Sequence, residues 1–261
     1  MNVSIFIKEL FVRNSVLASA GVIHLLGFAV SYILSLIDKR KVAGVNVWIK
    51  PMKFFSSVAI YIFSLCWILF YLPVAQQWLS IAIAILMYIE NFFITLQAGR
   101  GTTSHFNNKS IFDGIVFSIM GIAITLNTLL CAYILFLFFT NDVKITESYL
   151  WGIRFGLLIF ILASLEGFVM VKRRSNTISK QNKLNDGSKG LPFLNWSREG
   201  GDLRIAHFIG IHALQVLPIA GAFIRNLPVI IIISILYFII SALLFLQAIK
   251  GRVFMKKYFS L

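Results

Sequence analysis

Two histidines stand five residues apart in one apolar stretch of this 261-residue chain, and they are the side chains best suited to chemistry. His207 and His212 lie in the segment 203–218. On a helix with about 100° per residue they point about 140° apart, with Arg204 and Gln215 falling between them. Two histidines that chelate one metal ion from one helix are spaced i, i+4. The pair is therefore predicted to make two separate contacts.

Two acidic residues, Glu90 and Glu166, fall inside apolar runs, whereas the other eight fall in expected loops, tails or helix starts. A carboxylate in hydrocarbon needs a cationic partner or a proton. Glu90 and Gln97 share one helical face because they are seven residues apart. These positions predict a polar, cytoplasm-facing cavity with the following ligand-binding candidates: Glu90, Gln97, Arg100, His105, Asn107, Glu166, Arg204, His207 and Gln215.

His24 and His212 are candidates for a deeper site. At about 1.5 Å per residue each lies roughly 12 Å from opposite faces of a layer about 30 Å thick, so they could meet if their helices do. Each histidine has three interpretations: a neutral imidazole bonded across helices, a ligand of a metal ion or haem, or a proton relay or substrate contact. The cofactor is left open between none, a metal ion and haem.

Some polar residues favour a structural role. Ser110 and Asp113 have capping-box spacing, which predicts a helix start and a cap rather than a catalytic acid at Asp113. Glu90 and Glu166 could pair with Arg100, with Arg204 or with a lysine. The glycine-containing loop 99–104 could wrap an anion with backbone N–H groups, although it lacks the lysine of a phosphate-binding loop.

The composition identifies the class of protein in which these residues must act. Hydrophobic residues make up 59% of the chain, charged residues only 13%, and the mean hydropathy is +0.86. These values predict an integral membrane protein. The net charge of +14 comes from basic residues between apolar runs, so it predicts topology signals and contacts with anionic lipid head groups rather than nucleic-acid binding. Cys66 and Cys131 lie in apolar runs and are expected to be core residues.

The apolar runs predict an all-α fold, a bundle of seven transmembrane helices in a single domain over residues 1–261. The expected helices cover residues 16–37, 54–72, 78–97, 111–139, 149–171, 203–223 and 228–247. Pro51 suits a first helical turn, and residues 73–77 are expected to form a short turn. Residues 172–203 are expected to form a long, partly mobile cytoplasmic loop.

The distribution of basic residues predicts the orientation. Nineteen of the 24 Lys and Arg residues lie in the loops and tail on one side, four lie on the other side, and Arg154 lies within a helix. The positive-inside rule then places the C-terminus in the cytoplasm and the N-terminus outside. We expect a multi-pass protein of a bacterial cytoplasmic membrane.

Three motifs carry a resemblance to known sequences. They are KPMKF at 50–54, QAGRGTTSHFN at 97–107 and LRIAHFIGIHALQVLP at 203–218. Together they resemble a group of bacterial multi-pass membrane proteins, and the likeness covers most of the chain but implies no activity. Two functions are open: binding or transport of a small polar or anionic ligand or protons, and a membrane-embedded metal- or haem-dependent enzyme.

Overall fold

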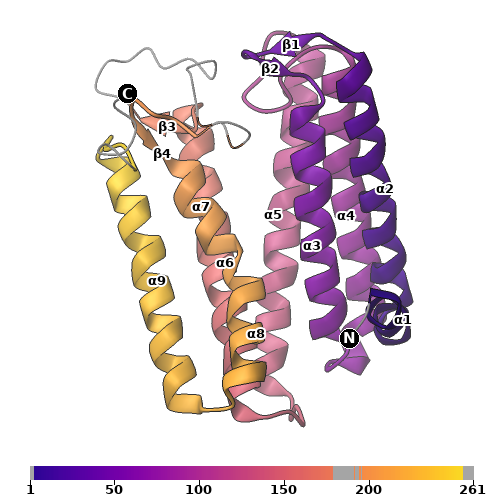
Figure 1. Ribbon diagram of the computed structural model, residues 1–261, viewed down its shortest axis with the longest axis vertical. Helices are drawn as coiled ribbons and strands as arrows, with labels where there is room; N and C mark the ends of the chain where they lie inside the picture. The colour runs from indigo at the N-terminus through magenta and orange to yellow at the C-terminus, as the bar shows by residue number, and fades with distance from the viewer. Residues whose placement is uncertain (1–2, 179–190, 192–193, 195, 255–261) are drawn as a thin grey trace. The chain divides into compact units, whose positions relative to one another are not determined.

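The computed structural model describes residues 3–178, 191, 194 and 196–254. Within these residues the chain is mainly helical, with connecting loops and two short pairs of antiparallel strands, and seven helices are long and apolar enough to cross a membrane. The chain divides into two compact units, Met1–Lys144 and Ile145–Leu261. Each unit is described by itself, and its elements are labelled in Figure 1.

The first unit is a bundle of four long helices with a short helix before them. Its elements are α1 (Val3–Arg13), α2 (Ser15–Ile37), β1 (Lys41–Val42), β2 (Val45–Asn46), α3 (Ile49–Leu69), α4 (Pro73–Gly99) and α5 (Ile111–Thr140). The two strands pair antiparallel, with Lys41 opposite Asn46. Asn14 begins α2 by accepting from the Leu17 N–H, and its amide donates to the Ser80 hydroxyl over 2.6 Å.

The second unit contains three membrane-length helical segments and, at one end of them, a second pair of short strands. Its elements are α6 (Glu147–Arg173), β3 (Thr177–Ile178), β4 (Gly201–Asp202), α7 (Leu203–Ile211), α8 (Ala213–Ile224) and α9 (Leu227–Ile249). The strands pair antiparallel, with Thr177 opposite Asp202. Much of the expected mobile loop falls at 179–190, 192–193 and 195, outside the described residues.

The seven expected helices are confirmed, and their boundaries differ where proline or a cap decides the start. Helix α3 begins at Ile49 rather than near residue 54, because Trp48 is held by the turn before it, and Pro51 lies in the first turn as expected. The expected turn at 73–77 is wrong. Pro73 instead opens α4, where its missing N–H costs no hydrogen bond.

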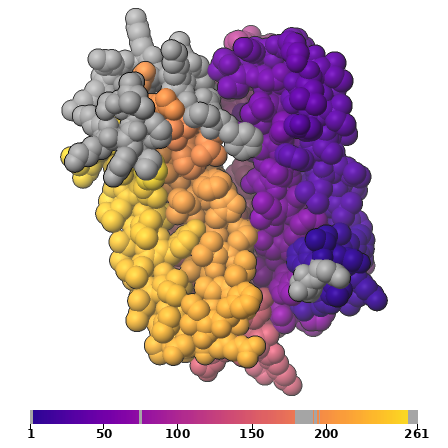
Figure 2. All heavy atoms as spheres, in the orientation of Figure 1, coloured from indigo at the N-terminus to yellow at the C-terminus, as the bar shows by residue number. Residues whose placement is uncertain are grey.

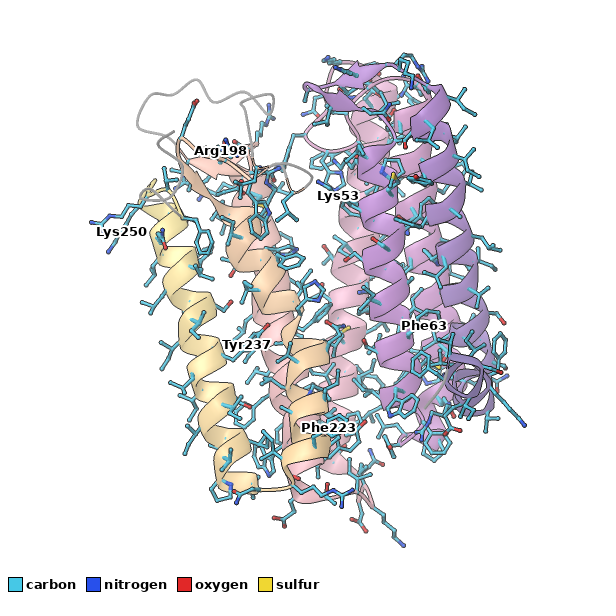
Figure 3. All side chains as sticks on the ribbon, viewed as in Figure 1. Lys53, Phe63, Arg198, Phe223, Tyr237 and Lys250 are labelled. Carbon is cyan, nitrogen blue, oxygen red and sulfur yellow. The ribbon has the colours of Figure 1, made fainter. Side chains whose placement is uncertain are left out.

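The sixth expected helix is broken at His212, which separates α7 from α8. The hydroxyl of Tyr237 on α9 donates to the Ile209 carbonyl over 2.6 Å, so a neighbouring helix satisfies an acceptor beside the break. Pro218 within α8 also lacks the N–H of a regular turn. In Figure 3 the labelled Tyr237 lies between α9 and this broken helix. The sequence pattern predicted one continuous helix because its apolar residues continue through the break.

The outer surfaces of the helices are apolar. On α9 the exposed side chains include Ile232, Leu236, Ile240 and Leu243. Figure 2 shows the atoms of α9, in yellow and orange, along one side of the second unit. A soluble monomer rarely exposes an apolar patch of this length, and such a surface is compatible with a helix that crosses a membrane.

Glycines bring α6 and α8 into close contact. A Cβ atom at Gly156 would lie 2.9 Å from the Ala213 carbonyl oxygen, and one at Gly152 would lie 2.5 Å from the Leu217 carbonyl oxygen. The two glycines form a small-xxx-small pair, which allows the backbones of membrane helices to approach closely. At the far end of this contact the Ser148 hydroxyl donates to the Gly221 carbonyl over 3.0 Å.

We predict that Gly152→Ala destabilises the protein, because the new methyl group meets a backbone carbonyl that can move only with its helix. The expected loss is about 1–3 kcal/mol in the free energy of unfolding. Gly167→Ala in the same helix is the matched control, since no atom lies within 4 Å of its added Cβ. Thermal unfolding in lipid nanodiscs measures both variants. Equal melting temperatures for the two variants would contradict the close packing.

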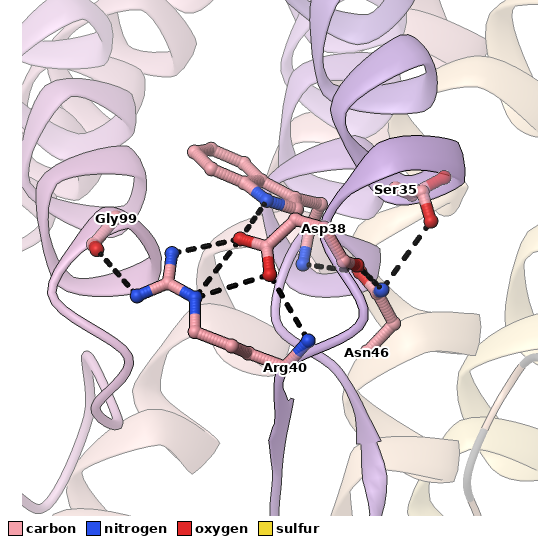
Figure 4. A network of polar contacts seen from close by, with 6 residues as sticks. Ser35, Asp38, Arg40, Asn46 and Gly99 are labelled. Carbon is pink, nitrogen blue, oxygen red and sulfur yellow. Dashed lines mark hydrogen bonds and ion pairs between the residues drawn. The ribbon is translucent and has the colours of Figure 1, made fainter.

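The carboxylate of Asp38, at the end of α2, joins several elements at the end of the first unit that carries the hairpin β1–β2 (Figure 4). It accepts from the Arg40 guanidinium over 2.7 Å and from the Trp48 indole N–H over 2.9 Å. Arg40 also donates to the Gly99 carbonyl over 3.1 Å, and Asn46 donates to the Ser35 carbonyl over 3.3 Å. The network therefore connects the ends of α2 and α4 to the hairpin and the start of α3.

The hydrogen bonds of this network require an ionised Asp38, so the pKa of its carboxyl determines the pH range in which they form. Hydrogen bonds from Arg40, and then from Trp48, hold the pKa of the Asp38 carboxyl well below its ordinary value. Because this pKa is lower in the folded state, the carboxylate contributes to the free energy of unfolding above its ordinary pKa of about 3.9. That contribution is lost as the pH falls from there through the lowered value. We predict that the Trp48 indole N–H resonance keeps its position between about pH 8 and pH 5.

Asp38→Asn should shift the same resonance at pH 7, because the amide carries no charge to hold the guanidinium. Asp142→Asn, at an exposed position in the same unit, is the control and should leave it in place. Two results would show that the carboxylate does not hold the hairpin. One is a Trp48 resonance that moves between pH 8 and pH 5, and the other is a resonance that stays in place in Asp38→Asn.

Candidate functional site

The start of α5 confirms the cap expected at Asp113. The Ser110 hydroxyl accepts from the Asp113 backbone N–H over 3.1 Å and donates to the Asp113 carboxylate over 2.8 Å. The first of these bonds satisfies one backbone N–H that a helix start leaves open, and the second holds the Asp113 carboxylate beside the cap.

Two predicted ligand-binding residues are bonded to the same carboxylate. Gln97 donates to Asp113 over 2.9 Å, and Arg100 forms an ion pair with it and also bonds the Gln97 side chain. Arg100 therefore pairs with Asp113 and not with Glu90, and these side chains tie α4 to α5. Asn107 donates to the Thr102 hydroxyl over 3.0 Å, which holds the connecting loop.

The same loop uses its backbone donors to end α4. The Gly101 N–H bonds the Ala98 carbonyl over 2.9 Å, and the Thr102 N–H bonds the Gln97 carbonyl over 3.0 Å. Donors that cap a helix are not free to hold an anion. The backbone N–H groups of Gly101 and Thr102 are therefore not available for the anion-binding role expected of residues 99–104.

Glu90 and His105 are brought together at the loop end of the first unit. The Glu90 carboxylate lies 3.9 Å from His105 Nε2, and the other ring nitrogen, Nδ1, bonds the Ser104 hydroxyl over 3.1 Å. Burial, and then the nearby positive charge of Lys50, lower the pKa of His105 well below its ordinary value. The imidazole is thus neutral at pH 7, and the contact with Glu90 is not an ion pair.

Several buried polar atoms of the first unit have no hydrogen-bond partner among the described residues. They belong to a band of four side chains on α2 and α4: His24 Nε2, Glu90 Oε2, both amide atoms of Asn91, and Thr95 Oγ1. His24 and Asn91 are each 1% exposed, and Glu90 is 5% exposed. A buried polar group without a partner costs about 1–3 kcal/mol, so a native cluster of them requires an explanation.

His24 is fixed in position from two sides. Its Nδ1 lies 2.7 Å from the Ala20 carbonyl, which can only accept, so Nδ1 carries the proton and a neutral ring presents Nε2 as an acceptor. The ring stacks on Tyr88 of α4 with centroids 5.2 Å apart. The backbone of Met87 is nearby, yet Nε2 makes no hydrogen bond of normal geometry. These two contacts hold the His24 ring in place beside α4, and His24 is the member of the band that α2 contributes.

Helix α4 sets the directions of the other members. Ile94 packs with Val116 and Met120 of α5, which places Glu90, one turn earlier, on the same side. Tyr88 faces α2 through its stack with His24. Asn91 lies between these two directions on a helix with about 100° per residue. Glu90, Asn91 and Thr95 thus lie along one broad side of α4, and His24 of α2 lies beside Tyr88 of the same helix.

The predicted residues of the second unit form separate contacts. His207 Nδ1 lies 2.8 Å from the Ala163 carbonyl of α6, and His212 Nδ1 lies 3.1 Å from the Gln215 side chain. Arg204 pairs with Asp202, the cap of α7, over 2.7 Å. The Oε2 atom of Glu166 is buried and has no hydrogen-bond partner in the described part of the chain. The two histidines contact different groups, as their spacing predicted.

The His24 and His212 pair stays a prediction because the two residues belong to different units. The same holds for a cavity shared by helices of both units. No group of three or more His, Cys, Asp or Glu side chains in the described ranges could hold a metal ion.

Asn91 and Thr95 were not among the predicted site residues. They are spaced i, i+4, which places them on one helical face, and this spacing was the signal that could have identified them. Asp113 was recognised as a cap, but its bonds to Gln97 and Arg100 join separate helices. No spacing in a single sequence shows such a contact.

Comparison with known proteins gives no relative: no protein family, curated protein or solved structure matches the chain. The function is therefore argued from the side chains themselves.

The difference between partnered and unpartnered asparagines can be measured. Asn127 accepts from the Tyr61 hydroxyl over 2.9 Å, whereas both amide atoms of Asn91 have no partner among the described residues. We predict that Asn127→Leu destabilises the protein by about 1–3 kcal/mol, because the buried Tyr61 hydroxyl loses its amide acceptor. Asn91→Leu should be neutral or stabilising, since it removes an unsatisfied amide of similar volume. Thermal unfolding of both variants without added solute tests this, and a large loss for Asn91→Leu contradicts it.

Proposed function

We propose that this protein binds a small polar solute inside the helical bundle of its first unit. The observation that carries the proposal is the band of unpartnered buried groups formed by His24, Glu90, Asn91 and Thr95. Seven apolar helices are compatible with a multi-pass membrane protein, and a solute site between such helices is built from inward-facing side chains. The solute would supply the missing hydrogen bonds.

A stability argument supports binding over a structural role. Polar side chains elsewhere in this unit join helices through satisfied bonds, as Asn14 does with Ser80 and Tyr61 with Asn127. The four residues of the band do not. Proteins retain unsatisfied or strained groups mainly where function requires them, because substitution by apolar residues would stabilise the fold.

Binding of a solute is also favoured over a relay of protons through Glu90 and His105. A relay requires a histidine that gains and loses a proton near pH 7. The lowered pKa of His105 keeps its ring neutral, so this neighbour of Glu90 does not exchange protons readily.

The test uses purified protein in lipid nanodiscs and three probes: urea, acetate and methylammonium. We expect saturation-transfer NMR to show binding of at least one probe. Thr95→Val should weaken that binding by about tenfold, the value of one hydrogen bond. The control is Thr128→Val, because Thr128 is half-buried on α5 and its hydroxyl bonds only its own helix among the described residues, through the Ile124 carbonyl.

A second pair of variants assigns the site to its unit. Glu90→Gln should change the affinity, whereas Glu166→Gln in the second unit should not. The proposal fails if no probe binds, if Thr95→Val and Thr128→Val behave alike, or if only Glu166→Gln affects binding.

A further inference from the structure

The ligand class follows from the hydrogen-bonding atoms that the band presents. Asn91 offers a donor, Nδ2, and an acceptor, Oδ1, side by side, and both are buried without a partner among the described residues. The matching group is one with a carbonyl oxygen and an N–H on the same edge, because the two then form a pair of parallel hydrogen bonds. A primary carboxamide and urea both have this edge.

The remaining atoms of the band are mostly acceptors. Glu90 Oε2 accepts and cannot donate when ionised, and His24 Nε2 accepts because its ring proton is on Nδ1. Thr95 Oγ1 can donate or accept. A ligand that satisfies them therefore needs N–H or O–H groups beyond those that Asn91 uses. An anion such as acetate brings acceptors only.

The charges of this region favour an uncharged ligand. The Lys50 ammonium lies within electrostatic range of both Glu90 and His105. The His105 ring beside them is neutral, so it supplies no counter-charge. An added cation or anion would leave a net charge in an apolar interior, which is costly, whereas a neutral solute leaves none.

Aromatic rings lie against both histidines of this region. On one side His105 lies against Phe54 and Phe117, with ring centroids 5.6 and 6.2 Å apart. On the other side the His24 ring lies against Phe55 and Tyr88, with centroids 5.9 and 5.2 Å apart. An uncharged amide group packs against such rings at a lower desolvation cost than a strongly hydrated ion does.

We propose that the solute is a small, uncharged, planar amide of the urea or primary carboxamide class. It is held edge to edge by Asn91, and the N–H groups that remain, one in a carboxamide and more in urea, are directed at Glu90 or His24. This inference rests on the proposed function and specifies its ligand.

Five probes in the nanodisc NMR titration test the ligand class: urea, acetamide, N,N-dimethylacetamide, acetate and methylammonium. We expect urea and acetamide to bind. N,N-dimethylacetamide should not bind, because it keeps the carbonyl but has no N–H. Asn91→Leu should weaken binding at least about tenfold, since it removes two hydrogen bonds. Asn91→Asp, which keeps the shape and loses the amide donor, should weaken it as well, and Thr128→Val should not.

The outcomes separate the two proposals. If acetate or methylammonium binds in an Asn91-dependent manner and the amides do not, the ligand class is overturned and solute binding stands. Urea binding that Asn91→Leu and Asn91→Asp leave unchanged also overturns the ligand class. If none of the five probes binds, both proposals fail. Melting temperatures of each variant, measured alongside, ensure that lost binding is not lost folding.

Discussion

A polar group placed in an apolar bundle needs a partner, and this requirement organises the first unit. Asn14, Tyr61 and Asp113 meet it by bonding across helices, to Ser80, Asn127 and Gln97 respectively. Because hydrocarbon contains no water to supply hydrogen bonds, each such bond also favours a particular pair of helices as neighbours. The band at Glu90 and Asn91 stands out against this background, since its groups have no partners among the described residues.

The second unit is held together differently. Glycines add close backbone contact to its side-chain hydrogen bonds, and Gly152 and Gly156 bring the α6 backbone onto carbonyl groups of α8. Close backbone packing is the main attraction left between helices when lipid is as apolar as the side chains. The break at His212 fits this arrangement because Tyr237 supplies a hydrogen bond to Ile209 from the neighbouring helix.

Much of the fold could be predicted from apolar run length, and the site could be predicted only in part. Glu90 was identified because a charge in an apolar run is costly wherever the chain folds. Asn91 was harder to select, because a membrane asparagine is usually bonded to another helix, as Asn127 is. Two acidic residues, Glu90 and Asp113, lie close enough to Arg100 in the sequence to pair with it. The packing of α4 on α5 brings Arg100 to Asp113.

The sequence by itself determined the class of protein, the seven helices and the cap at Ser110, because hydrophobicity, helix length and capping are local properties of the chain. The tertiary structure decided where α7 ends at His212, which carboxylate Arg100 meets, and which buried polar groups lack a partner. These depend on contacts between residues far apart in sequence. A hydrogen bond forms within about 3.2 Å in space, and no spacing along one chain specifies that distance between two helices.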